Sequence, residues 1–235
     1  MRRRDFLQAS AMLAAGCAPP GGPPPAPSGP PGGAITATAG YPPIGAKWKV
    51  RMTRTGLFHS SVDESEITAA TLNFNGRPGY GLVGPSATIV LEPATFNRTG
   101  MLENGRIALT DSPDNGVFSW PLWVGKEWQG TSVHADSNRG EIWPSAEFNA
   151  RVAAIENVTV PAGTFMAFRV EYEGGIGSSV PDNWRDPVGR PGFETREIHW
   201  YAPAPKLTVR SDIERLNSHW RGAGRTTTEL LGVPK

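Results

Sequence analysis

The chain has 235 residues, 19% of them charged, and a formal net charge of +1. Without residues 1–16, which hold three arginines and one aspartate, the net charge becomes −1. A near-neutral chain without runs of Lys or Arg argues against nucleic-acid binding and against electrostatic attachment to a membrane.

Residues 1–16 have the pattern of an export signal. A basic start precedes a short apolar stretch, which Gln8 and Ser10 interrupt and which is too short to cross a bilayer. Gln8 also stands where Lys is common in the twin-arginine export signature. The residues that match that signature are Arg3, Arg4, Phe6 and Leu7.

The only cysteine, Cys17, follows Ala14-Ala15-Gly16 in a pattern that resembles the lipobox of bacterial lipoproteins. The resemblance implies a diacylglycerol thioether on Cys17 and an acyl chain such as palmitate on its amine, which together anchor a protein stably. Acylation would also remove the liability of a free exported thiol. Ala18, in place of the Asp that favours inner-membrane retention, favours the outer membrane, facing the periplasm or the cell surface. Two alternatives stay open: a cleaved signal peptide with an incidental cysteine, and an uncleaved anchor.

Residues 17–40 are predicted to form a tether. Between Ala18 and Gly33 almost every residue is Pro, Gly, Ala or Ser, and such a segment buries too little surface to offset its chain entropy. Prolines favour an extended polyproline II conformation, so the sixteen residues would hold a domain up to about 50 Å from the lipid.

Residues 41–235 are predicted to form one antiparallel β-domain. Apolar and polar residues alternate with a period of two, which indicates strands with one buried and one exposed face. The clearest alternation covers residues 46–52, 148–152, 164–172 and 206–213. The stretch from Val62 to Leu72 fits either a helix or a strand. The expected fold is all-β: a single curved antiparallel sheet or incomplete barrel of about nine to eleven strands.

One hairpin is predicted in detail between Val160 and Gly163. Pro161 fixes its own φ at the second turn position, and Gly163 accepts a positive φ. The turn therefore needs both residues for its geometry, and no chemistry is implied.

Three blocks resemble the TapB-like family of bacterial envelope proteins, a domain of unknown function. They are WPLWVGKEW (120–128), VTVPAGTF (158–165) and WYAPAPKLTVRSD (200–212), and the resemblance covers roughly residues 46–233. The chain departs from the family at Ala204-Pro205, where a Gly-containing turn is common. The resemblance implies an antiparallel half-barrel similar to the periplasmic lipoprotein carriers, and it brings no catalytic residues.

No catalytic, metal-binding or cofactor motif is found in the sequence. The four histidines lack zinc-ligand spacing, and no Gly-x-Ser-x-Gly elbow is present. Asp114 and its neighbours before Gly116 are interpreted as a turn and not as a calcium loop. Glu197 and His199 share one face of a predicted strand and are interpreted as a polar pair. We therefore expect a protein that is not an enzyme and that holds no metal or cofactor.

Trp120, Trp123 and Trp128 cluster within nine residues, and the aromatic residues as a whole are divided between the core and a binding role. The candidates for ligand or partner contact are Trp143 and Trp184, which stand before prolines in loop-like stretches, and Tyr201. Those expected to fill the core are Trp48, Trp128 and Trp200. The segment from Gly174 to Gly192 is rich in Gly, Pro and Asp, and it is the first candidate for a lid over an open concave face.

The main functional hypothesis is a non-enzymatic envelope lipoprotein, held at the membrane through lipid on Cys17. Its curved sheet would bind a lipid, a glycan or a partner protein. The alternatives are a structural or assembly subunit of an envelope complex, and a secreted hydrolase that uses scattered carboxylates.

Overall fold

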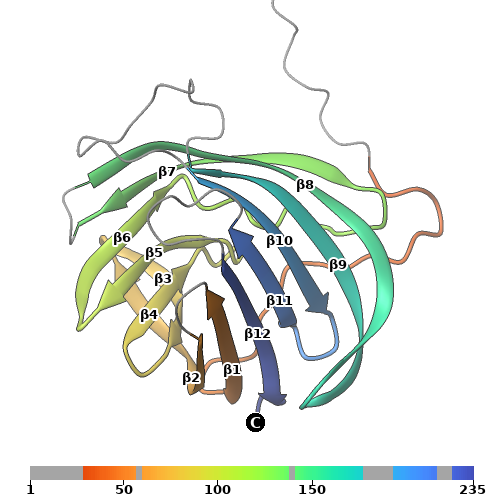
Figure 1. The fold of residues 1–235 in the computed structure, drawn as a ribbon, viewed down its shortest axis with the longest axis horizontal. Coiled ribbons are helices and arrows are strands. Elements are labelled where there is room, and N and C mark those ends of the chain that lie inside the picture. Colours follow the sequence, from red (N-terminus) through yellow and green to blue (C-terminus); the bar gives the residue numbers. More distant parts are fainter. Residues whose placement is uncertain (1–28, 57–59, 138–140, 177–192, 216–223) are drawn as a thin grey trace, which may run out of the picture.

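The computed structural model describes residues 29–56, 60–137, 141–176, 193–215 and 224–235, and this part of the chain forms β-strands without helices (Figure 1). Consequently it has no helix that could cross a membrane. The strands are β1 (Lys47–Gly56), β2 (Ser60–Phe74), β3 (Arg77–Val83), β4 (Ala87–Leu91), β5 (Arg98–Glu103), β6 (Arg106–Ser112), β7 (Glu127–Asp136), β8 (Glu141–Val160), β9 (Gly163–Ile176), β10 (Phe193–Ala202), β11 (Leu207–Arg215) and β12 (Gly224–Gly232). The four stretches of clear alternation coincide with parts of β1, β8, β9 and β11, which confirms the all-β prediction.

The strands form a closed antiparallel barrel in which β12 returns to pair with β1. In the closing pair, Val50 lies opposite Leu230 and Gly56 lies opposite Gly224. The prediction of an open curved sheet or incomplete barrel, and the half-barrel that the family resemblance implied, were therefore wrong about closure. Alternation along a strand reports which face is buried, but not which distant strand lies beside it.

The described strands also number twelve and not nine to eleven. β4 has the sequence ATIVL and β5 has the sequence RTGMLE, and neither alternates between apolar and polar residues, so no period of two marks them. The ambiguous stretch from Val62 to Leu72 lies within β2, so it is a strand. The predicted hairpin is confirmed: β8 ends at Val160, β9 begins at Gly163, and Gly163 has a φ of 131°.

The first of two hydrophobic clusters is built around the connector between β6 and β7, residues 113–126. Phe118 and Leu122 of this connector are buried against Phe168 and Val170 of β9. An isolated bridge joins Leu122 to Ala37, with N–O distances of 2.8 and 3.0 Å. The connector thus fills space over the face of β9 that would otherwise be concave and open.

The second hydrophobic cluster brings together the first strand of the barrel and its last two strands. It includes Trp48 of β1, Val209 of β11 and Leu230 of β12, all buried. The β8–β9 hairpin reaches this cluster, since the Ala162 amide donates to the Leu230 carbonyl at 3.1 Å. Figure 1 shows this hairpin beside the C-terminal end of β12. Of the tryptophans expected in the core, Trp48 is buried, whereas Trp128 and Trp200 are partly buried and pack against the clusters.

Candidate functional site

Most of the predicted site residues lie outside the described residues. These are the lipidation site Cys17, the export residues Arg3, Arg4, Phe6 and Leu7, and the candidate contact Trp184. The candidate lid falls there too from residue 177 to 192. Lipidation, export and the lid stay predictions.

Trp143 lies on a strand, whereas the sequence placed it in a loop. Its backbone is part of β8, opposite His134 of β7. The register shifts between Ser132 and His134, at the level of Pro144. Such an irregularity accommodates a proline in a strand, because proline has no N–H to give to the ladder.

Tyr201, which the sequence predicted as a ligand or partner contact, is buried in the core. The side chain is 1% exposed, and its hydroxyl donates to the Gly40 carbonyl at 3.1 Å. Burial raises the pKa of Tyr201 to about 12. The ring packs edge-on against Trp120, with 4.9 Å between centroids. Tyr201 therefore supports Trp120 from inside the core, and Trp120 is the residue that reaches the surface.

A cleft of about 1370 Å³ lies where the β6–β7 connector meets strands β7, β8 and β9. One wall comes from Ala94, Thr95 and the connector, and the other comes from the three strands. The side chains of interest that line it are Phe118, Trp120, Trp128, Gln129, Asn149 and Arg151, together with Glu127, Glu171 and Glu173. This combination of aromatic rings with amide and charged groups makes the cleft the candidate functional site.

Both indoles of the cleft are held by their N–H groups. The Trp120 indole donates to the Thr95 carbonyl at 2.6 Å, and the Trp128 indole donates to the Gly116 carbonyl at 3.1 Å. Phe118 lies beside Trp120 at 5.1 Å between centroids. Because each N–H already has an acceptor inside the protein, the rings are fixed and can offer a ligand only their apolar surfaces.

A buried lysine organises the end of the connector. The ammonium group of Lys126 donates to the Ser119 and Pro121 carbonyls, the latter at 2.9 Å. It also lies 4.6 Å from the centroid of Trp123 and 5.9 Å from that of Trp128. Burial lowers the pKa of Lys126. The carbonyls and rings together replace the water that an ammonium group would otherwise keep.

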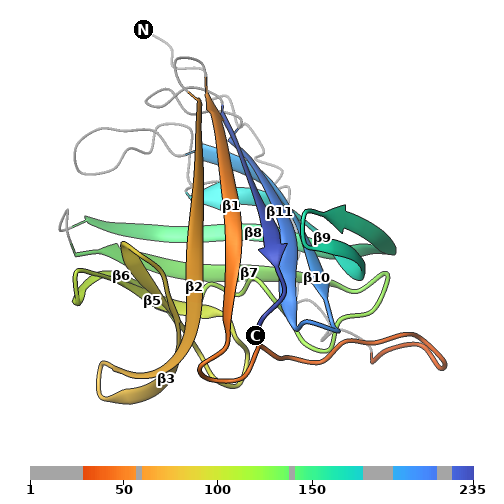
Figure 2. The same ribbon diagram turned by 90° about the horizontal axis from the view of Figure 1, so that it is seen from below.

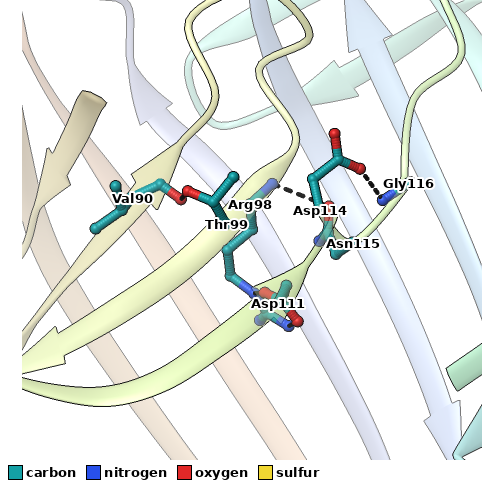
Figure 3. Close-up of polar contacts among 7 residues, drawn as sticks. All are labelled: Val90, Arg98, Thr99, Asp111, Asp114, Asn115 and Gly116. Carbon is teal, nitrogen blue, oxygen red and sulfur yellow. Dashed lines mark hydrogen bonds and ion pairs between the residues drawn. The ribbon is translucent and has the colours of Figure 1, made fainter. Parts of the chain in front are cut away.

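The start of the connector is tied to β5 by side chains (Figure 3). Asp114 accepts from the Gly116 amide at 2.7 Å, and Asn115 accepts from the Arg98 amide at 2.9 Å. The Arg98 guanidinium in turn donates to Asp111 at 2.6 Å. The segment is therefore a turn closed by its own carboxylate, as the sequence predicted, and it fixes the position of Gly116 in the cleft wall.

Polar side chains from neighbouring strands line the cleft in pairs. The Gln129 amide donates to Asn149 at 3.0 Å, joining β7 to β8. The Arg151 guanidinium donates to Glu171 at 2.7 Å, joining β8 to β9. Glu171 also faces Arg169 at 3.1 Å. These groups present hydrogen-bonding atoms at strand spacing, on the face of β7, β8 and β9 opposite to Trp128 and Ala150.

Along its first half, β7 has one edge that no strand of the described part of the barrel pairs with. β6 pairs with β7 only at Val133–Asp136, whereas β8 pairs along β7 from Glu127 onward. The first half of β7 therefore has a partner strand on the β8 side alone, and the cleft opens along this half.

The sequence showed only part of this site. It placed Trp120 and Trp128 in one aromatic cluster, but assigned Trp128 to the core. Gln129 and Asn149 were missed because they are twenty residues apart and meet only through the β7–β8 register. Glu197 and His199, the predicted polar pair, do meet at 3.1 Å on β10, and neither of them lines the cleft.

No group of three or more His, Cys, Asp or Glu side chains that could hold a metal ion occurs among the described residues.

Several solved structures have a distant likeness to the chain, and three of them are described here. A candidate lipoprotein from Parabacteroides distasonis has a TM-score of 0.44 at 15% identity, over 85% of this chain and 99% of the other. A candidate exported protein with a YmcC-like fold from Bacteroides fragilis has a TM-score of 0.43 at 15% identity, over 85% and 100%. The hypothetical lipoprotein YmcC from Escherichia coli has a TM-score of 0.39 at 11% identity, over 78% and 87%.

No family model matches the chain, and no curated protein matches it. TM-scores below 0.5 do not establish a shared fold, and identities of 11–15% do not establish a family. Membership of the TapB-like family stays a prediction.

Proposed function

We propose that this protein is an envelope lipoprotein whose cleft binds a neutral glycan chain without catalysis. The observation that carries the proposal is one cleft whose lining combines the fixed indoles of Trp120 and Trp128 with the amide groups of Gln129 and Asn149. The two amides lie on the other face of β7 and β8 from Trp128, so a chain bound in the cleft would reach both sets of groups around the edge of β7. Sugar rings have apolar faces that pack on aromatic surfaces, and hydroxyls at their edges that bond to amide and charged groups.

The charge of the cleft favours a neutral glycan. Its lining includes Glu127, Glu171 and Glu173 but only one cation, Arg151, which is paired with Glu171. An anionic glycan would meet a surplus of carboxylates and be repelled. A neutral chain would meet acceptors for its hydroxyl protons instead.

A lipid fits this cleft less well than a glycan. A bound acyl chain needs an enclosed apolar cavity, whereas this cleft is open and has charged residues along its strand wall. The face of β9 that could have held a lipid is covered by Phe118 and Leu122 of the connector.

The carboxylates of the cleft favour binding over hydrolysis. Glu171 faces two arginines, Arg151 and Arg169, at 2.7 and 3.1 Å. Glu173 is 75% exposed and faces Arg196 at 3.6 Å. Glycoside hydrolysis needs one carboxyl group in an apolar setting to act as the acid, and neither the ion-paired Glu171 nor the exposed Glu173 has such a setting.

The location in the cell envelope is supported by residues 1–17, where an export signal runs directly into Cys17. Replacing Cys17 by Ser should abolish acyl labelling in cells and release the protein from membranes. Continued labelling of the Cys17→Ser chain would contradict the lipoprotein part of the proposal.

The glycan part is tested by titrating the protein with maltohexaose, cellohexaose and chitohexaose while following tryptophan fluorescence and heat. We expect one of these neutral sugars to bind with a Kd of about 1 mM or below. In the Gln129→Ala/Asn149→Ala variant, whose replaced side chains are exposed, binding should weaken about thirtyfold, since each of the two lost hydrogen bonds to the sugar contributes about 1 kcal/mol.

The matched control is Thr159→Ala/Thr164→Ala, which removes another exposed cross-strand pair, 2.9 Å apart, at the tip of the β8–β9 hairpin. It should bind as the parent does. Equal weakening in both variants, or no binding of any of the three sugars, would refute a neutral-glycan cleft.

A further inference from the structure

A second hollow, of about 450 Å³, lies at the end of the barrel where the chain enters β1 and leaves β12. Its lining is mostly proline and apolar: Pro42, Pro43, Phe165, Ala204, Pro205 and Val233, with Pro234 and Lys206. Beside it, Ile44 is 54% exposed, and Val233 itself is 45% exposed. Figure 1 places the C-terminal end of β12 at the same end of the barrel as the β8–β9 and β10–β11 turns.

The segments around this hollow carry cations and no acidic residue. They are residues 41–46, 161–166, 203–206 and 232–235, and none of them contains Asp or Glu. Two exposed lysines, Lys206 and Lys235, belong to them. Lys47, which follows residue 46, has its charge balanced by Glu66 at 3.7 Å and is not counted among these cations. The surface is thus apolar at its centre with positive charge at its margin.

The exposed apolar turn at Ile44 is held rigidly. The Tyr80 hydroxyl donates to the Pro42 carbonyl, and the Ala46 amide donates to the Pro43 carbonyl at 3.0 Å. The Gly45 amide donates to the Ala69 carbonyl at 2.8 Å. Because this turn is fixed by the barrel, placing Ile44 in an apolar medium would cost little further ordering.

The N-terminal part of the chain joins the barrel at this same end. Gly40 is tied to the core through the Tyr201 hydroxyl, and residues 41–43 lead directly into the hollow. Before it reaches this end, the entering segment is paired with the connector through the Ala37–Leu122 bridge, and Figure 2 shows it extending away from β1. A membrane anchor on Cys17 would keep the barrel within the length of the tether, about 50 Å, which allows this end to contact the bilayer.

We propose that this end of the barrel, the Ile44–Val233 surface with Lys206 and Lys235, docks on the surface of an anionic bilayer. Ile44, Val233 and the prolines enter the boundary between headgroups and acyl chains, and the two lysines lie among the anionic headgroups. The chain as a whole is near neutral, which is why its net charge alone argued against such an interaction. This end of the barrel differs because its segments carry two exposed lysines and no Asp or Glu. The contact needs neither the lipid on Cys17 nor a glycan in the cleft, so it can fail or hold independently of the proposed function.

The test uses the full chain with Cys17→Ser, so that no lipid can anchor it, in sedimentation with vesicles. The vesicles are phosphatidylcholine alone or phosphatidylcholine with phosphatidylglycerol. We expect binding to the anionic vesicles that weakens as salt is raised. The further changes Lys206→Gln/Lys235→Gln should weaken it about thirtyfold, because each lysine near an anionic surface contributes about 1 kcal/mol. Ile44→Ser/Val233→Ser should weaken it about tenfold or more.

The matched control replaces an exposed cation and an exposed valine elsewhere on the barrel, Arg106→Gln/Val62→Ser, in the same Cys17→Ser chain. It contains the same residues 1–16, so any contribution of that segment is equal in every protein compared. The control should bind as the parent does. If both variants of the Ile44–Val233 surface bind like the control, or if the parent prefers neutral vesicles or self-associates without binding vesicles, the proposal is wrong.

Discussion

Individual buried polar residues hold the surface of this barrel in place. Asp212 of β11 is the clearest case: its carboxylate accepts from Arg210 at 2.9 Å, from Arg225 at 2.8 Å and from Thr227 at 2.7 Å. Asn97 plays the same role for the cleft wall, since its side-chain amide pairs with both backbone groups of Phe118 at 2.8 and 2.9 Å. Each joins segments that the sequence alone cannot align.

Asp212 should make stability depend on pH. Burial of Asp212 raises the pKa of its carboxyl, but the hydrogen bonds from Thr227, Arg225 and Arg210 outweigh burial and lower that pKa below 3.8. A carboxyl whose pKa is lower in the folded state stabilises the fold above its unfolded pKa, and loses this effect as pH falls through its folded pKa. We expect Asp212→Asn to lower the free energy of unfolding by about 2–3 kcal/mol at pH 7, measured with urea. The loss should shrink as pH falls below about 4.

The control for this change is Asp63→Asn, on an exposed ion pair with Arg54. Exposed pairs contribute about 1 kcal/mol or less, so this variant should unfold almost like the parent. If the Asp212→Asn chain showed the same deficit at pH 3 as at pH 7, the linkage to Asp212 ionisation would be wrong.

At the scale of strands, two glycines leave room for aromatic side chains that come from other strands. A Cβ added at Gly100 of β5 would lie 2.3 Å from Cζ of Phe74 and 2.9 Å from the Leu109 carbonyl oxygen. A Cβ added at Gly130 of β7 would lie 2.0 Å from Cζ of Phe148. The rings therefore pack directly on backbone, which a larger residue would prevent.

We expect Gly100→Ala to destabilise the fold by about 1–3 kcal/mol, because Phe74 and the backbone of β6 must both shift. Adding Phe74→Leu should recover part of the loss, since the shorter side chain frees the space that the new methyl needs. Thermal unfolding of both variants checks this. Gly232→Ala is the control, because nothing lies within 4 Å of its added Cβ. A deficit as large for Gly232→Ala as for Gly100→Ala would contradict a steric origin.

Strands could be predicted from the sequence where alternation is long, and not where it is short or interrupted. β9 shows Met166, Phe168, Val170 and Tyr172 in regular alternation and was predicted correctly. β4 and β5 do not alternate between apolar and polar residues, and Pro144 made the start of β8 resemble a loop. In each case the neighbouring strand supplies the ordering that the local sequence does not.

At the scale of the molecule, closure and the cleft both depend on pairings between residues far apart in the chain. Residues Lys49–Gly56 of β1 pair with residues Gly224–Gly232 of β12, from the other end of the domain. No local sequence pattern predicts this pairing. The cleft likewise combines connector residues near Trp120 with Asn149 and Glu171 of other strands. The aromatic cluster was visible in the sequence, but its polar partners were not, because register is a property of the assembled barrel.

Closure should make the two hydrophobic clusters unfold together. Leu230 of β12 is 1% exposed and belongs to the second cluster, whereas Phe168 and Val170 belong to the first. Leu230→Ala should cost about 3 kcal/mol by leaving a cavity. Because β12 closes the barrel, this loss should reach the first cluster as well, so the amides of Phe168 and Val170 should exchange about a hundredfold faster. Leu231→Ala, at the partly exposed neighbour, should have a much smaller effect. Protection that is lost around Leu230 but unchanged at Phe168 and Val170 would show instead that the barrel opens in separate parts.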